Sequence, residues 1–262
     1  MDLAWLTARP IAHRGLHDAA HGIVENTLPA AAAAVAKAYA IECDVLLSAD
    51  EEVVVFHDDV LERLTHAEGP VAARTFAELA GLDMRGTTAR IPSLAQLLAT
   101  IDGRVGLVIE MKSSFPRRPD DRLPARVAAA LAGYRGPVVT KSFDPALVAA
   151  AHRAMPGIGH GVVAERARDP ADYGGLGPVR RFALTHLLHA AWSRPDFVSY
   201  GITDLPAPGP WIARHVFGLP VITWTVRTPV DRARAARHAD QIVFEGFDPD
   251  ATEVPRRRLI SA

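Results

Sequence analysis

The chain has 262 residues with 29 Lys+Arg and 30 Asp+Glu, which gives a formal net charge of -1. This near-neutral charge provides no broad basic field, so we expect no nucleic-acid partner. No apolar run approaches the length of a membrane span, no signal-peptide core precedes Pro10, and a single cysteine, Cys43, excludes an internal disulfide.

These properties predict a cytoplasmic protein without stable membrane insertion. The length suits one large domain over residues 1–262 with a substantial core. The first predicted strand covers residues 10–13. Thr27 then has the character of a helix N-cap, followed by Pro29 in the first turn and an alanine-rich helix to about Ala40.

A β-hairpin is predicted next, with strands over 41–47 and 53–56 and a polar turn centred near Asp50. Antiparallel pairing around that turn places His57 across from Cys43. A histidine is therefore expected within reach of the two carboxylates that flank Cys43.

Acidic residues interrupt two apolar strands. Strand alternation puts Glu42 and Asp44 on one face, with Cys43 facing the core, and it puts Glu110 and Lys112 on a common face of a later strand. Carboxylate oxygens suit a hard divalent metal such as Mg²⁺ or Ca²⁺ better than zinc. Simple ion pairs with Arg14 or Lys112 are the structural alternative for these acids.

The rest of the chain alternates between apolar strands and helices. An insertion over about 59–104 ends in a helix from Pro92 to about Ile101. Further parallel strands are expected over 105–111, 137–142, 158–163, 197–200, 220–226 and 241–244.

Together with the strands at 10 and 41, these make eight parallel strands, which predicts an α/β fold of the (β/α)₈ TIM-barrel type with a small insertion after the second-strand hairpin. An open doubly wound sheet is the alternative, but no glycine-rich dinucleotide fingerprint follows the first strand. In a barrel the site lies at the carboxyl ends of the strands, where His13, Ser142 and the acidic residues fall.

Taken together, the motifs resemble those of the glycerophosphodiester phosphodiesterase family, a branch of the phosphatidylinositol-phospholipase-C-like barrel phosphodiesterases. The resemblance covers nearly the whole chain, and it rests on the order and spacing of short motifs. These are His13-Arg14-Gly15, Glu25-Asn26-Thr27, Glu42-x-Asp44, His57-Asp58, Leu61-x-Arg63-x-Thr65, Ile91-Pro92-Ser93-Leu94, Glu110-x-Lys112, Ser142-Phe143 and Trp224-Thr225-Val226.

The resemblance implies metal-dependent hydrolysis of a glycerophosphodiester to sn-glycerol 3-phosphate and an alcohol, in lipid and glycerol metabolism. It implies a role for each matching residue. Glu42, Asp44 and Glu110 would be the metal ligands, and His13 and His57 would be the general acid/base pair. Arg14 and Lys112 would bind the phosphate, with Glu25 and Asn26 as supporting residues. Trp224 would be a wall of the substrate pocket or part of the barrel core.

Three positions depart from the family pattern at the mouth of the barrel. Lys141 replaces the small or apolar residue expected before Ser142-Phe143, which adds a cation to the pocket. The last strand ends in Glu245-Gly246 instead of Thr-Asp, and Arg227 stands where relatives often carry asparagine.

Other functions remain open at this point. A lysophospholipase D-like enzyme or another phosphodiesterase could use the same residues, and a non-catalytic barrel could bind phosphorylated ligands, although binding requires neither histidine. The head group of the substrate, the choice of metal and the oligomeric state are not set by these motifs. We also expect the long connection over 164–195 to cover part of the site, and Arg256, Arg257 and Arg258 to form a solvated tail.

Overall fold

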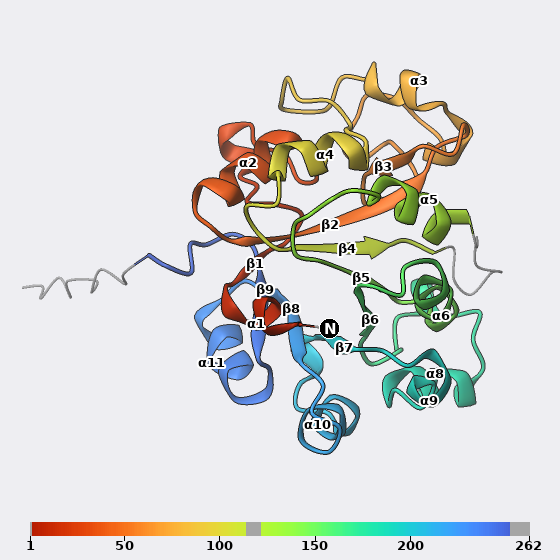
Figure 1. Cartoon of the computed structure of the whole chain (residues 1–262), viewed down its shortest axis with the longest axis vertical. Coiled ribbons are helices and arrows are strands. Elements are labelled where there is room, and N and C mark those ends of the chain that lie inside the picture. Colours follow the sequence, from red (N-terminus) through yellow and green to blue (C-terminus); the bar gives the residue numbers. More distant parts are fainter. Residues whose placement is uncertain (1, 114–121, 252–262) are drawn as a thin grey trace, which may run out of the picture.

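A closed barrel of parallel strands organises the molecule (Figure 1). The computed structural model describes residues 2–113 and 122–251. Within those residues nine strands form one sheet, in the order β1-β9-β8-β7-β6-β5-β4-β2-β3, and a parallel pairing of β1 with β2 closes it. The strands are β1 (Ile11–Ala12), β2 (Ala40–Leu47), β3 (Val53–Val55), β4 (Leu107–Met111), β5 (Val138–Ser142), β6 (Gly159–Ala164), β7 (Phe197–Gly201), β8 (Val221–Val226) and β9 (Gln241–Phe244).

Every pairing around the ring is parallel, and β3 pairs with the adjacent β2 in antiparallel orientation. The eight strands of the ring fall where the sequence predicts them, so the TIM-barrel prediction is confirmed. The hairpin register is confirmed too, because Val45 pairs with Val55 and the Phe56 N–H donates to the Asp44 carbonyl. Extending the same register by one residue would place His57 opposite Cys43.

Helices surround the ring of strands (Figure 1). Among the described residues the longer ones are α2 (Leu28–Ala36), α4 (Leu94–Ile101), α5 (Arg122–Ala130), α6 (Pro145–Ala154), α8 (Pro178–Thr185), α10 (Pro208–His215) and α11 (Pro229–His238). Thr27 caps α2 as predicted, but this helix ends at Ala36 and not near Ala40, because Ala38 has a left-handed backbone (φ 55°) and β2 already begins at Ala40.

The main core lies between the strands and these helices. On β2 the outward side chains of Ile41, Cys43 and Val45 join it, so Cys43 faces away from its acidic neighbours as predicted. The inward positions of the same strand belong to the barrel interior. There Ala40 packs with Val108, Phe197 and other buried residues.

The amino end of the barrel is closed. Helix α1 (Ala4–Ala8) contributes Leu6 to the interior cluster, and its Trp5 side chain packs over Gly106, where an added Cβ would come within 2.1 Å of the ring. Because this end is plugged by apolar side chains, a polar site in the interior can open only at the carboxyl ends of the strands.

Residues between β3 and α4 form a small separate layer beside the barrel (Figure 1). It includes the 3₁₀ turn η2 (Val71–Ala73) and helix α3 (Phe76–Ala80), which is held by a capping box between Thr75 and Glu78. Its own cluster of buried side chains, including Phe56, Leu61 and Leu79, packs against the hairpin.

The connection between β6 and β7 folds into α7 (Pro170–Tyr173), α8 and α9 (Ala190–Ser193). Phe182, Leu188 and Trp192 in this stretch are exposed, and the expected cover over the site stays a prediction. The expected tail at Arg256–Arg258 lies outside the described residues. Among the described helices, none combines the length and the apolar composition that crossing a bilayer requires.

Candidate active site

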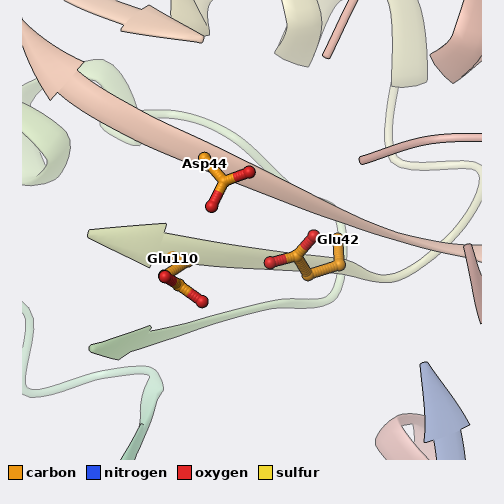
Figure 2. Close-up of side chains that lie close together, drawn as sticks. All are labelled: Glu42, Asp44 and Glu110. Atoms are coloured by element: carbon orange, nitrogen blue, oxygen red, sulfur yellow. The ribbon is translucent and has the colours of Figure 1, made fainter. Parts of the chain in front are cut away.

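Three carboxylates meet inside the barrel near the carboxyl ends of β2 and β4. Asp44 is in register with Glu110 on the neighbouring strand, and Glu42 precedes Asp44 on the same face of β2. One ligand atom from each residue lies within 4.8 Å of the others, and the three residues are 1–5% exposed. Figure 2 shows the three side chains gathered beside the two neighbouring strands.

This donor set fits a hard divalent cation, since three carboxylates from rigid strands supply oxygen ligands and negative charge. The arrangement follows from strand periodicity, as the sequence predicts. Its electrostatic cost is high, however, because like charges buried together disfavour ionisation unless cations compensate them.

Two lysines provide that compensation. Lys112 Nζ lies 3.2 Å from Asp44 Oδ1 and 3.1 Å from Glu110 Oε1. Lys141 Nζ lies 2.9 Å from Glu42 Oε1 and 2.9 Å from Glu110 Oε2. Each carboxylate therefore has at least one ammonium partner.

The ion pairs keep these groups charged. Burial opposes ionisation of Asp44, but Lys112, His57 and Arg14 hold its pKa well below the usual range. Burial likewise opposes ionisation of Glu110, but Lys112 and Lys141 lower its pKa to about 2. Asp44 and Glu110 are thus kept ionised by the cations beside them.

The turn after β1 supplies polar groups to the same end of the barrel. The backbone N–H of Arg14 donates to Glu42 Oε2 at 3.1 Å, and the Arg14 guanidinium Nη1 donates to Glu25 Oε1 at 2.6 Å while Nε lies 3.3 Å from Asp44. Gly15 has φ +79°, and a Cβ at this position would meet the Ala30 backbone at 2.9 Å. A glycine is required there for the turn to pack against α2.

The side-chain amide of Asn26 forms two hydrogen bonds with Asp44. Its Nδ2 donates to Asp44 Oδ2 at 2.9 Å, and its Oδ1 accepts from the Asp44 backbone N–H at 3.2 Å. Asn26 is 3% exposed and has φ 56°, a conformation that asparagine tolerates better than most residues. These contacts fix the orientation of an acidic residue of the cluster.

Glu245, at the end of β9, contacts the first histidine. Its Oε2 lies 2.5 Å from His13 Nδ1 and 3.6 Å from His17 Nε2, while Arg227 Nε donates to Oε1 at 2.6 Å. Burial raises the pKa of Glu245, but hydrogen bonds from His13 and His17 outweigh burial and keep it well below the usual range. The other ring nitrogen of His13, Nε2, lies 4.0 Å from Glu42 Oε2, at the edge of the acidic cluster.

The second histidine has a parallel arrangement. His57 Nδ1 lies 2.5 Å from Asp58 Oδ1, and Arg63 Nε donates to Asp58 Oδ2 at 2.5 Å. Arg63 also donates to Glu25, which in turn accepts from Arg14. A chain of charged hydrogen bonds therefore links the orientation of His57 to that of Arg14.

A hollow of about 300 Å³ opens beside the cluster. It is lined by His57, Asp58, Asp59, Glu110, Met111, Lys112, Ser113 and Phe143. Trp224 meets the ring of Phe143 edge-to-face at a centroid distance of 5.5 Å, and its Nε1 donates to the Ser199 carbonyl at 3.2 Å. Trp224 is also packed on the interior cluster, so its ring joins the core to the wall of the hollow.

The structure thus brings most of the expected site residues to one end of the barrel. Sequence reasoning missed the contact of Glu245 with His13 and that of Asp58 with His57. The pairing of His57 with the adjacent Asp58 was visible in the chain as neighbouring residues. The Glu245 contact depends on the closure of the barrel by β1 and β9.

The chain resembles known proteins in sequence and in fold. The model of a family described as the glycerophosphoryl diester phosphodiesterase family matches residues 13–251. YhdW of Bacillus subtilis, provisionally named a glycerophosphodiester phosphodiesterase, is 39% identical over 109 residues. That match covers 39% of this chain and 44% of YhdW, so it spans less than half the length of this curated relative.

Two solved structures share the fold over most of the chain. A protein of Silicibacter pomeroyi, provisionally named a glycerophosphoryl diester phosphodiesterase, has 27% identity and a TM-score of 0.72, with 90% of this chain and 89% of that chain covered. A phosphodiesterase of Oleispira antarctica, solved with its product sn-glycerol-3-phosphate, has 21% identity and a TM-score of 0.72, with 90% and 92% covered.

Proposed function

The chain belongs to the glycerophosphoryl diester phosphodiesterase family, and from this membership we propose that it hydrolyses glycerophosphodiesters to sn-glycerol 3-phosphate and an alcohol. The observation that carries the proposal is the meeting of the carboxylates Glu42, Asp44 and Glu110 with two carboxylate-bound histidines at one end of the barrel. The glycerol 3-phosphate bound to the Oleispira antarctica protein supports the product assignment.

In this proposal His13 and His57 are the general acid and base. Each imidazole directs Nδ1 at a carboxylate, Glu245 or Asp58, which leaves Nε2 for proton transfer. A neutral ring can accept a proton at Nε2 and a protonated ring can donate one, and both forms are accessible to histidine near neutral pH. The nucleophile needs the first action and the leaving alkoxide needs the second.

Arg14 and Lys112 are proposed to bind the phosphate. Their charges are already anchored by Glu25, Asp44 and Glu110, so both cations are held at the site before the substrate arrives. An ammonium has three donors and Lys112 has two carboxylate partners here, so one donor can face a phosphate oxygen. Preorganised cations of this kind stabilise the charge that builds up on the phosphoryl oxygens.

Glu42, Asp44 and Glu110 are proposed to hold a divalent cation, Mg²⁺ or Ca²⁺. When bound, that ion would neutralise phosphate charge as a Lewis acid. Asn26 would keep Asp44 in its ligating orientation, and Glu25 would keep the Arg14 guanidinium oriented for phosphate binding. Trp224 would form an apolar wall of the substrate pocket.

We propose that the whole chain is one catalytic barrel with residues 59–104 as its insertion. It would act on a small molecule in the cytoplasm, as part of lipid and glycerol metabolism. A lysophospholipase D-like activity remains the second candidate. The exposed apolar side chains Phe182, Leu188 and Trp192 on the β6–β7 connection favour it, because a lipid tail would find apolar surface there.

A substrate panel tests the proposal. Purified protein is assayed with Mg²⁺, Ca²⁺ or EDTA. Release of sn-glycerol 3-phosphate is measured from several glycerophosphodiesters, and release of the acylated glycerol 3-phosphate is measured from lysophospholipids. We expect release from glycerophosphodiesters with an added divalent metal and loss of release in EDTA. Release from lysophospholipids alone would favour the second candidate, and no release from any phosphodiester would refute both.

A further inference from the structure

Lys141 lies inside the acidic cluster. On β5 it is in register with Glu110 of β4, which is itself in register with Asp44 of β2, so the three residues form one row across adjacent strands. Its side chain is 3% exposed, and Nζ lies 2.9 Å from both Glu42 Oε1 and Glu110 Oε2. The ammonium therefore bridges two of the three carboxylates.

The phosphodiesterase chemistry proposed above gives no role to this lysine. Lys112, at the rim, lines the hollow where a phosphate could bind, whereas Lys141 is not among the residues that line it. Lys141 Nζ instead contacts two carboxylates of the cluster, Glu42 and Glu110. Its contacts are the oxygens that a metal bound to Glu42 and Glu110 would need.

The charge balance of the cluster depends on this contact. Three carboxylates face two ammonium groups, and Glu110 is shared between them. A divalent ion placed between Glu42 and Glu110 would lie beside a buried positive charge or would have to displace it. Both alternatives weaken binding, because repulsion between cations is strong where water is excluded.

We propose that Lys141 is a built-in competitor of the divalent cation for Glu42 and Glu110, so that it sets a low metal affinity and keeps the carboxylates paired when no metal is bound. This inference rests on the proposed metal role of the carboxylates. It goes further because Lys141, a residue outside the family pattern, would determine the affinity for the metal. It concerns metal binding and does not depend on which diester is hydrolysed.

Calorimetric titration of the metal-stripped protein with Ca²⁺ and Mg²⁺ tests the inference. Lys141→Met removes the competing charge and should bind metal at least about tenfold more tightly than the wild type. The matched control is Lys37→Met, because Lys37 is a half-exposed lysine paired with Asp248 on the outside of the barrel. The metal affinity of this control variant should equal that of the wild type. Equal or weaker binding by Lys141→Met, or no binding by either protein, would overturn the inference.

Thermal melting provides a second readout, because loss of Lys141 leaves the carboxylates under-compensated. Millimolar Ca²⁺ should raise the Tm of Lys141→Met by more than it raises the Tm of the wild type. Lys141→Gln, which keeps hydrogen-bond donors without the charge, is the substitute if the methionine variant does not fold in EDTA. If both variants stay unfolded even with Ca²⁺, the ion does not replace the ammonium and the inference is wrong.

These measurements are separate from the proposed activity. If no glycerol 3-phosphate is released but Lys141→Met binds metal more tightly, the proposed function fails while the competition stands. If release is observed but the affinities do not differ, the proposed function stands and the competition fails.

Discussion

Glu245→Gln is the substitution that best tests how the histidines are activated. In the wild type, Glu245 Oε2 lies 2.5 Å from His13 Nδ1, and the Glu245 side chain is 20% exposed. Glutamine preserves the shape of the side chain but removes the charge that stabilises a protonated His13 ring. Arg227 also loses its charged partner, which removes a salt bridge at the exposed rim.

The magnitude follows from the type of bond. A hydrogen bond to a charged group contributes about 1.5–3 kcal/mol, so the loss of about 2 kcal/mol of it in the transition state corresponds to a fall in kcat of about thirtyfold. KM should change little, because Glu245 acts on the substrate through His13.

The assay is the rate of sn-glycerol 3-phosphate release over a range of substrate concentrations, which gives kcat and KM separately. Glu68→Gln is the matched control, since Glu68 is an exposed residue outside the site, and it should leave kcat and KM unchanged. A folded Glu245→Gln protein with kcat within about twofold of the wild type would refute the positioning role.

Three further predictions concern the supports of the site. Gly15→Ala should lower the free energy of unfolding by at least about 2 kcal/mol, because it forces a side chain into φ +79° with the Ala30 backbone 2.9 Å away. The control is Gly157→Ala, where an added Cβ meets open space, and it should lower the free energy of unfolding by less than about 1 kcal/mol in the same denaturant titration. Asn26→Gly keeps the left-handed backbone but releases Asp44, so calorimetry should show metal affinity about tenfold weaker, and an unchanged affinity would remove the orienting role. The Glu110 carboxyl has a pKa of about 2 in the folded protein and a higher pKa in the unfolded chain. Its contribution to the free energy of unfolding is therefore complete above the unfolded pKa and should be lost as the pH falls from about 5 to 2. A free energy of unfolding that stays constant across that range would contradict the ion pairs.

The parts of the site that the sequence predicts are those governed by local periodicity. Alternation along β2 separates Glu42 and Asp44 from Cys43, and the length of the hairpin turn sets the register that brings His57 near them. These relations require only a strand, a turn and a count of residues. The fold could be predicted in the same way, from the number of apolar runs and the lengths of their connections.

The contacts that could not be predicted depend on closure of the ring. Glu245 reaches His13 because β9 pairs with β1 across 232 positions of sequence, and the His13 N–H donates to the Phe244 carbonyl at 2.9 Å. No local pattern specifies that register. Lys141 was recognisable as an added cation, but the choice of Glu42 and Glu110 as its partners depends on the stagger between β4 and β5.

The most direct test of the proposed function is the rate of sn-glycerol 3-phosphate release from glycerophosphocholine by His13→Ala and His57→Ala, each shown by circular dichroism to be folded. We predict that each variant loses at least about a hundredfold in rate, the usual scale of acid–base catalysis, while His215→Ala on the exposed face of α10 keeps the wild-type rate. Near-wild-type release by either folded site variant would contradict the assignment of that histidine to proton transfer.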